Sequence, residues 1–584
     1  MGTISDKLMR IINTKEDIRQ ALISKGYDVP TSIPFKEYAK MISDLPCRVD
    51  SFPDIEGIVA RYSALGLTNE QMAANPVWVD KTGNGHDIQL KNFSWKGMSG
   101  VGGYVQDFND FKNNATVDKI RIDEQGSNFI KVTILTTGIG NAIYIPKNIY
   151  QFNKSYFIKI SSEGYDEGDM ALSFYAPSTS TATTVTVSLN PNGVTEIPAI
   201  KEDDFLAVYI NVSGKVGSFT VEQLPLYPGA LVFDGVDDYG VCDNFPILTK
   251  EKGYTVVALR QWDQDFLNTT LTGGLLSTRN YSTGEGVAFE KIESSNKGYW
   301  NLGAGGIIDF AKSPFTWQTS KQYNNVGILK GDKNHGKPLC VGCGLSGGQQ
   351  CGRFAIWELV FLDHDATEEE LTKIKDYFVK TYPWLFPDQA WTVTGKTNED
   401  EDRATIANIT GNGNDLVLSN FGFAEGSGYN EEGEYAGYLV TDGVDDKIVS
   451  SSFGMGKDFT IVGDWKFIDN KKSGTGLVKG SSFYIYNTMI GLDLYINSGS
   501  VTNSLDGIKS INAACSDGRA YDRNWNEILA NTGNVVGSGG MLEVSSSGGR
   551  FDRIAFKNLA IYPRILSKDD CIKAYNYLQT IKAK

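Results

Sequence analysis

The sequences DKTGNGHDIQLKNF (residues 80–93) and NITGNGNDLVLSNF (residues 408–421) are two copies of one element. In both copies, Asn-Gly steps reach positive φ at little steric cost, and alternating apolar residues follow. Further along, LVFDGVDDYGV (231–241) matches LVTDGVDDKIV (439–449), where an Asp-Gly step predicts another tight turn. We interpret both motifs as β-hairpins. The chain is therefore internally duplicated and rich in strands.

Both copies end in a similar way. A strand beginning with GRF, at residue 352 in the first copy and residue 549 in the second, leads into a short predicted helix. Thr367 with Glu370 forms a capping-box pattern, and Ser567 with Asp570 is a weaker version of it. We expect these helices to pack on the edges of their sheets.

The first copy is interrupted, because its two motifs lie much farther apart than those of the second copy. Residues 105–228 fill this gap with alternating apolar runs and turn residues, which predict a separate sandwich. The expected domains are therefore a first sandwich built from 49–104 and 229–388, an inserted sandwich at 105–228, and a second sandwich at 389–584.

Residues 1–48 differ from the rest. Apolar residues at helical spacing and stop signals at Gly26 and Pro46 predict a short helical pair. A helical pair this small rarely folds without a partner. We therefore expect it to be a docking or oligomerisation segment.

Composition narrows the function classes. The 584 residues carry a formal net charge of −15 without a cluster of Lys and Arg, so a nucleic-acid partner is not expected. No signal-peptide core and no long apolar run occurs, so neither export nor membrane insertion is expected. The seven cysteines are too scattered for a disulfide scaffold.

The repeated turn motifs, the closing strand and the capped helix together resemble laminin-G and concanavalin-like lectin sandwiches. The insertion resembles a jelly-roll carbohydrate-binding module, and residues 1–48 resemble a segment of tailed-phage structural proteins. The whole arrangement is similar to virion proteins of crAss-like phages of gut bacteria. The expected fold is mainly β: two concanavalin or laminin-G-like jelly-roll sandwiches, one carrying an inserted β-sandwich, plus a small N-terminal α-helical segment.

This resemblance implies a bacteriophage structural protein, a head or tail fibre or decoration, made in the host cytoplasm and located on the virion. Its lectin-like sandwiches would bind host-surface polysaccharide during host attachment. Residues 1–48 would bind other virion proteins, and a homo-oligomer is expected, with a trimer favoured by analogy. Two alternatives remain open: a purely architectural assembly protein, and a polysaccharide-degrading enzyme. We expect no catalytic activity, because no run of alternating acids typical of glycosidase sites is present.

Two groups of acidic residues could bind calcium, which prefers carboxylate and amide oxygens. The other interpretation is that these residues only shape turns. The candidates are Asp80, Asn84 and Asp87 in the first motif and Asp234, Asp237 and Asp238 in the second, with Asp442, Asp445 and Asp446 as the equivalent of the latter. Asn408 replaces Asp80 in the second copy, which would weaken calcium binding there. Calcium is the only cofactor that we expect as a candidate.

Aromatic side chains could stack on sugar rings, although alternating aromatics also occur in cores. The candidates are Tyr299, Trp300 and Trp317 in the first copy and Tyr484, Tyr486 and Tyr495 in the second. Cys340, Cys343, Cys351 and His335 could supply zinc ligands, but without a second CxxC pair we favour small buried thiols. GLSGG around Ser346 has the spacing of a nucleophile motif but precedes a strand, so we do not expect catalysis there.

Overall fold

The computed structural model describes most of the chain beyond residue 51. The described residues are 52–583 except 152–153, 176–184, 200–206, 249–251, 279–287, 292–296, 301–306, 310–313, 321–337, 346–347, 432–434, 469–474, 480–482, 488–490, 497–503, 507–510, 530–538, 541, 545 and 548–549. The expected helical segment 1–48, His335 and Ser346 lie outside them. Residues 55–584 form one compact unit, which contains all the elements below.

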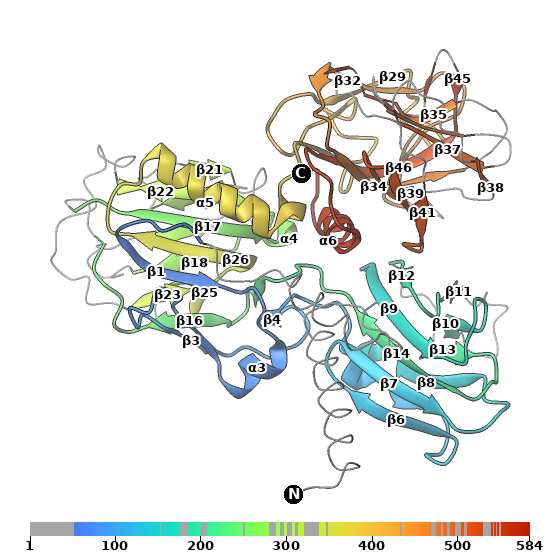
Figure 1. Cartoon of the computed structure of the whole chain (residues 1–584), viewed down its shortest axis with the longest axis horizontal. Helices are drawn as coiled ribbons and strands as arrows, with labels where there is room; N and C mark the ends of the chain where they lie inside the picture. Colours follow the sequence, from blue (N-terminus) through green and yellow to red (C-terminus); the bar gives the residue numbers. More distant parts are fainter. Residues whose placement is uncertain are drawn as a thin grey trace, which may run out of the picture. The chain divides into compact units, whose positions relative to one another are not determined.

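The first sandwich consists of two largely antiparallel sheets (Figure 1), which are separated by an apolar core. The first sheet contains β1 (Ile58–Ser63), β4 (Gly100–Val101), β15 (Leu231–Asp234), β17 (Thr255–Trp262), β22 (Phe315–Thr319) and β26 (Arg353–Leu362). The second contains β2 (Val77–Trp78), β3 (Ile88–Lys91), β16 (Tyr239–Cys242), β18 (Gly273–Ser277), β19 (Ala288–Lys291), β20 (Lys297–Trp300), β21 (Ile307–Asp309), β23 (Leu339–Val341), β24 (Cys343–Leu345) and β25 (Gln349–Cys351). Tyr62 and Trp262 from the first sheet meet Ile88 and Leu276 from the second in one buried cluster.

The second sandwich repeats this plan. Its first sheet contains β27 (Gln389–Thr392), β30 (Gly428–Asn430), β31 (Tyr438–Val440), β34 (Thr460–Phe467), β39 (Ile511–Cys515), β40 (Arg519–Asp522), β41 (Glu527–Leu529) and β46 (Ile554–Tyr562). Its second contains β28 (Thr405–Ile406), β29 (Leu416–Ser419), β32 (Lys447–Ser450), β35 (Thr475–Lys479), β36 (Phe483–Asn487), β37 (Gly491–Ile496), β38 (Ser504–Asp506) and β43 (Glu543–Val544). Two small ribbons, β33 (Phe453–Gly454) with β42 (Gly539–Gly540) and β44 (Ser546–Ser547) with β45 (Arg550–Phe551), complete it.

The register shows how closely the copies correspond. β26 pairs with β17, β15 and β1, just as β46 pairs with β34, β31 and β27. Both central pairs carry a bulge at the equivalent place, between Leu259 and Arg260 and between Asp464 and Trp465. The duplication seen in the sequence is therefore a duplication of strand order and register.

The inserted sandwich has two sheets of its own. One contains β5 (Lys112–Asn113), β8 (Asn141–Pro146), β10 (Met170–Tyr175), β11 (Val185–Ser188) and β13 (Ala207–Val212). The other contains β6 (Ile120–Gln125), β7 (Phe129–Ile134), β9 (Tyr156–Glu163), β12 (Val194–Ile197) and β14 (Gly217–Gln223). Buried residues of both sheets, among them Ile143, Phe174, Ile158 and Val221, form a separate core.

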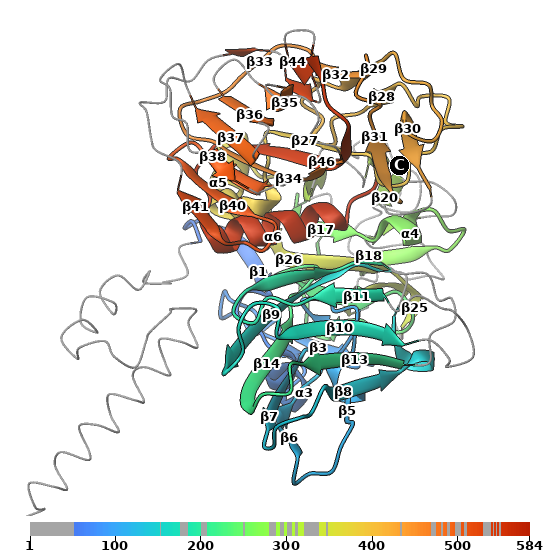
Figure 2. The ribbon, with the colours of Figure 1, turned by 90° about the vertical axis from the view of Figure 1, so that its right-hand side faces the viewer.

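Short helices lie around the sheets: α3 (Asn69–Ala74), α4 (Gln264–Leu267), α5 (Glu368–Thr381), α6 (Lys568–Gln579) and the 3₁₀ turns η1 (Phe108–Asp110), η2 (Lys147–Ile149) and η4 (Pro383–Leu385). The capping box that opens α5 is confirmed, with Thr367 and Glu370 bonded reciprocally. The expected edge packing is wrong for α6, which lies on the central strands β34 and β46 (Figure 2). The reason is that buried residues extend along much of α6, among them Cys571, Ala574 and Leu578, and need more apolar surface than a sheet edge offers.

The hairpin interpretation holds for one motif and fails for the other. TGNG joins β2 to β3 and β28 to β29, which are antiparallel pairs. DGVDD instead joins β15 to β16 and β31 to β32, which belong to different sheets. The physical reason is a set of hydrogen bonds that stabilises the turn between the two sheets. In the first copy, the Asp238 carboxylate accepts hydrogen bonds from the Asp234 N–H (3.0 Å) and the Ser99 hydroxyl (2.9 Å).

The fold-class prediction is confirmed: the described residues form a mainly β protein of antiparallel, jelly-roll-like sandwiches with few helices. No helix among these residues has the length and apolar character needed to cross a membrane.

Candidate functional site

The first calcium candidates, Asp80, Asn84 and Asp87, hold the TGNG loop together. Buried Asp80 accepts hydrogen bonds from the backbone N–H groups of Arg61 (3.0 Å) and His86 (3.3 Å). Asn84 donates to the Val59 carbonyl at 2.8 Å, and Asp87 accepts from the Asp80 N–H at 2.8 Å. These polar atoms already have partners within the fold. Calcium binding at this loop stays a prediction.

The second calcium candidates do come together. Asp234, Asp237 and Asp238 place one oxygen each within 4.8 Å of the others, and Asp442, Asp445 and Asp446 do the same. Calcium takes about six to eight oxygen ligands, so each triad would supply only part of a coordination shell.

The buried member of each triad has an unusual acidity. Burial, and then the neighbouring Asp234, raises the pKa of Asp238 to about 7. Burial likewise raises the pKa of Asp446 to about 6, and Asp442 and Asp445 add to the effect. A proton or a cation would relieve this repulsion.

The structure places the sugar-binding candidates on strands. Trp317 is half-buried on β22 at the end of a sheet. Tyr299 and Trp300 lie on β20, Tyr484 and Tyr486 on β36, and Tyr495 on β37, where it pairs in register with Tyr484. The side chains of these five residues lie outside the described part of the structure, so their role stays a prediction.

Three of the four cysteines of the first copy, Cys340, Cys343 and Cys351, form a buried cluster. Cys343 and Cys351 are register partners on β24 and β25. Burial raises the pKa of Cys351 to about 11, and its thiol donates to the Gly348 carbonyl at 3.2 Å. A protonated thiol is a poor metal ligand, which agrees with the buried-thiol interpretation.

Helix α6 contacts all three sandwiches. Tyr577 donates a hydrogen bond to Gln261 Oε1 on β17 (3.1 Å), and its ring lies 6.4 Å from that of Trp357 on β26. Tyr575 packs edge-on against Phe157 of the inserted sandwich, with ring centroids 5.2 Å apart. Any site beside α6 is therefore built from segments far apart in the sequence.

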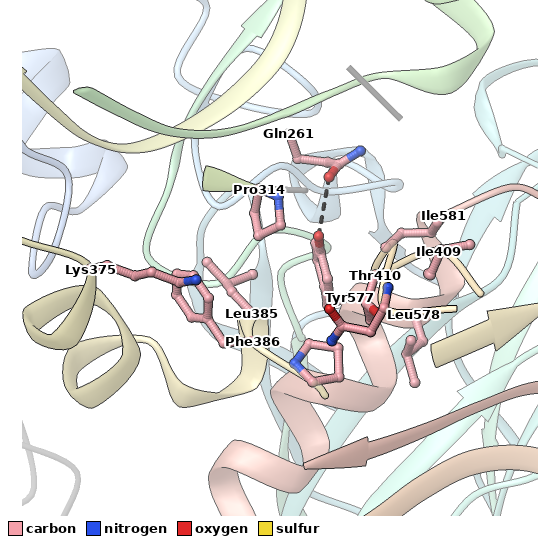
Figure 3. A pocket seen from close by; sticks show the side chains of 12 residues that line it. Gln261, Pro314, Lys375, Leu385, Phe386, Ile409, Thr410, Tyr577, Leu578 and Ile581 are labelled. Carbon is pink, nitrogen blue, oxygen red and sulfur yellow. Dashed lines mark hydrogen bonds between the residues drawn. The ribbon is translucent and has the colours of Figure 1, made fainter. Parts of the chain in front are cut away.

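A small cavity of about 140 Å³ lies at the Tyr577 side of α6. Figure 3 shows the Gln261–Tyr577 hydrogen bond at its wall, with the apolar side chains of Pro314, Leu385 and Ile581 around it. Thr410, another polar residue of this wall, lies within hydrogen-bond distance of the Asp388 carbonyl (3.1 Å) and of Asn408 Oδ1 (2.9 Å). This cavity is a small junction with a mixed polar and apolar lining.

A larger pocket of about 320 Å³ lies on the other side of α6, between this helix, the hairpin that joins β40 to β41, and the β9 and β12 region of the inserted sandwich. Its polar lining includes Lys159, Asn192, Asn524, Lys568 and Asn576. Its size falls in the lower part of the range for small-molecule sites, about 300–1,000 Å³. This pocket is the candidate functional site, hereafter the α6 pocket.

Trp525 is the unusual residue of the α6 pocket. It has a positive φ of 60°, which is costly for a bulky residue. The Asp522 carboxylate stabilises this turn by accepting hydrogen bonds from the N–H groups of Asn524 and Asn526, both at 2.8 Å. The Trp525 ring is buried edge-on against Tyr575, with centroids 5.6 Å apart.

Two buried polar atoms of residues in this lining, Trp525 Nε1 and Asn576 Oδ1, have no hydrogen-bond partner among the residues that the structure describes. An unpaired buried polar group costs about 1–3 kcal/mol. Strain and unpaired groups at one place are typical of a binding site. The sequence analysis missed Trp525, and the only local signal was an aromatic residue flanked by two asparagines in NWN at 524–526.

Comparison with known proteins adds the following. No protein-family model and no curated protein matches this chain. Among solved structures it is similar to a Trypanosoma rangeli sialidase in complex with sialic acid, at 10% identity and a TM-score of 0.23, covering 84% of this chain and 90% of the sialidase. It is also similar to the receptor-binding domain of botulinum neurotoxin D, at 10% identity and a TM-score of 0.23, covering 58% of this chain and 89% of that domain. These are likenesses between β-sandwich proteins, and values this low do not bear on function.

Proposed function

We propose that this chain binds saccharides, and that it does so as a structural component of a phage virion that attaches to host-surface polysaccharide. The observation that carries the proposal is the α6 pocket, whose walls combine amide, ammonium and indole groups. Such groups can hydrogen-bond to several hydroxyls of one sugar ring, and a few convergent polar groups in a concave site are typical of ligand recognition.

The virion role rests on a different observation, the resemblance of residues 1–48 to a segment of phage structural proteins. Attachment of this segment to other virion proteins, with a trimer as the favoured oligomer, would present several copies of the pocket together. Several weak sites at one surface raise the overall avidity by about 10²-fold or more. Antibody labelling of purified particles tests this part separately.

Binding without cleavage is part of the proposal. In the first sandwich, Glu358 is committed to an ion pair with Arg61 at 3.2 Å and is fully buried, so it is not available as a catalytic acid. In the second sandwich, Asp464 is buried and accepts from Tyr438 at 2.9 Å. These two carboxyl groups thus stabilise the sheets.

The test is binding of labelled full-length chain to host cells with and without their capsule, with released reducing sugar measured in the same tube. Capsule-dependent binding without release supports the proposal. Sugar release favours the degrading enzyme, and absence of binding with normal incorporation into particles favours the architectural protein. Repeating the assay with a calcium chelator shows whether calcium at the aspartate triads contributes.

A further inference from the structure

The charge of the α6 pocket differs from that of the chain. The whole protein carries −15, yet three of the pocket's lining residues are lysines, Lys159, Lys568 and Lys573, against one acid, Asp569. Lys573 is engaged, with its ammonium 3.4 Å from Asp570 and 4.4 Å from the Trp384 ring centroid. Lys159 and Lys568 are exposed and form no ion pair with any residue that the structure describes.

Nearby acids form no ion pair with these two ammonium groups within the part of the chain that the structure describes. Glu222 is the register partner of Lys159, whose charge lowers the Glu222 pKa against the larger, opposite effect of burial. Glu196 lies 3.7 Å from the Arg523 guanidinium, which is its own counter-charge. A pocket with two lysines outside any such ion pair in a strongly acidic protein would attract an anionic ligand and disfavour a cationic one.

The remaining polar groups favour the same ligand. The Asn192 side-chain oxygen accepts from the Ser162 N–H at 2.9 Å, which leaves its NH₂ group as the part that can donate to a ligand. Trp525 Nε1 is a second donor, and Asn576 Oδ1 is an acceptor suited to a hydroxyl. Donors therefore outnumber acceptors, as recognition of an anion with attached hydroxyls requires.

We propose that the α6 pocket binds an acidic sugar, that is, a saccharide residue carrying an anionic group such as a carboxylate or a sulfate. Lys159 and Lys568 approach the anionic group from two different sandwiches, while Asn192, Trp525 and Asn576 bind the ring substituents. This inference deepens the proposed function and rests on it. It also assigns a role to the inserted sandwich, which contributes one wall of the pocket.

The test compares two ligands that differ only in charge. Full-length chain is titrated with a uronate-containing capsular polysaccharide and with the same polysaccharide after chemical reduction of its carboxyl groups to alcohols. Dextran sulfate and dextran form a second pair, which separates sulfate from carboxylate recognition. We expect at least about tenfold tighter binding to the anionic member of one pair, with an affinity that falls as salt is added.

Substitutions test whether the anionic ligand binds in the α6 pocket. Lys159→Gln combined with Lys568→Gln should remove most of the preference for the anionic member, and Trp525→Phe should weaken binding while keeping an aromatic ring. Asn192→Ala serves if Trp525→Phe does not fold. Lys112→Gln, an exposed lysine on β5 in the other sheet of the inserted sandwich, is the control and should bind like the wild type.

The outcomes separate the two proposals. Equal binding of charged and reduced polysaccharide, unchanged in the lysine double variant, would overturn the acidic-sugar inference and leave saccharide binding standing. No binding of any member of either pair would overturn both.

Discussion

The two duplicated sandwiches share a strand register but stabilise the outer face of their central sheet differently. In the first, Arg61 on β1 pairs with Glu358 on β26, and Tyr377 and Tyr382 complete a closed network. In the second, the equivalent positions are Ala390 and Asn558. The acid has moved to Asp464 on β34, at the position that Leu259 occupies in the first copy.

This difference affects how each sandwich meets its neighbours. The first network is satisfied within its own sandwich. In the second, Asp464 belongs to a charged group that continues into the inserted sandwich: burial, and then the charge of Asp464, raises the pKa of Glu196. The terminal helices differ in the same way. The Tyr377 hydroxyl of α5 accepts from Arg61 of its own sandwich, whereas the Tyr577 hydroxyl of α6 donates to Gln261 of the first sandwich. The buried acid of the first copy is thus paired inside its own sandwich, whereas that of the second belongs to a charged group shared with the inserted sandwich.

Removing one member of the buried ion pair should produce the largest effect. Arg61→Ala leaves Glu358 buried without its counter-charge, and we expect a loss of about 3–5 kcal/mol. Hydrogen–deuterium exchange measured on peptides from β26 should show the loss, while peptides from β46 serve as the internal reference.

The double change Arg61→Ala with Glu358→Asn transfers the second copy's residues into the first. Because no buried charge then remains unpaired, we expect most of the lost protection in β26 to return. A double variant no more protected than Arg61→Ala would show that the pair is needed for packing rather than for charge balance.

The TGNG loops offer a second exchange between the copies. Asn408 donates from its amide to the carbonyls of Gln389's side chain (2.5 Å) and Gly413 (2.6 Å), whereas Asp80 at the equivalent position only accepts. Asn408→Asp would place a carboxylate against two acceptor oxygens, at an expected cost of about 2–3 kcal/mol.

The reverse change should be milder. Asp80→Asn keeps the oxygen that accepts from the Arg61 N–H and loses the one that accepts from the His86 N–H. The Thr82 hydroxyl lies 2.8 Å from both oxygens and keeps a partner, so the expected cost is about 1 kcal/mol. Urea unfolding of both variants gives the comparison, and equal destabilisation would contradict the proposed difference between the loops.

The features that could be predicted from the sequence are those specified by neighbouring residues. The TGNG turns, the Thr367–Glu370 capping box and the burial of Trp357 follow from local pattern, and the duplication follows from matching the copies. DGVDD was misinterpreted because its geometry depends on a bond from distant Ser99. The α6 pocket combines residues 159, 192, 525 and 568, so no local pattern indicates it.

The aspartate triads should make the stability of the two copies depend differently on pH. The folded-state pKa of Asp238 is raised to about 7, so folding favours its protonated form. The stability this group contributes is complete below the ordinary carboxyl pKa of about 4 and is lost as pH rises towards 7. Asp238→Asn, which resembles the neutral carboxyl, should therefore be more stable than the wild type at pH above 7, by about 1–2 kcal/mol, with no gain near pH 4.

Asp446→Asn is the matched variant, because the pKa of Asp446 is raised only to about 6. The gain in stability from Asp446→Asn should be smaller than that from Asp238→Asn, and it should stop increasing at a lower pH. Urea unfolding across this pH range, with a calcium chelator present, measures both curves without competition from a cation. If neither variant gains stability as pH rises, burial and carboxylate repulsion at the triads do not reduce the stability of the folded protein. The two corners would then be equivalent in electrostatics as well as in backbone structure.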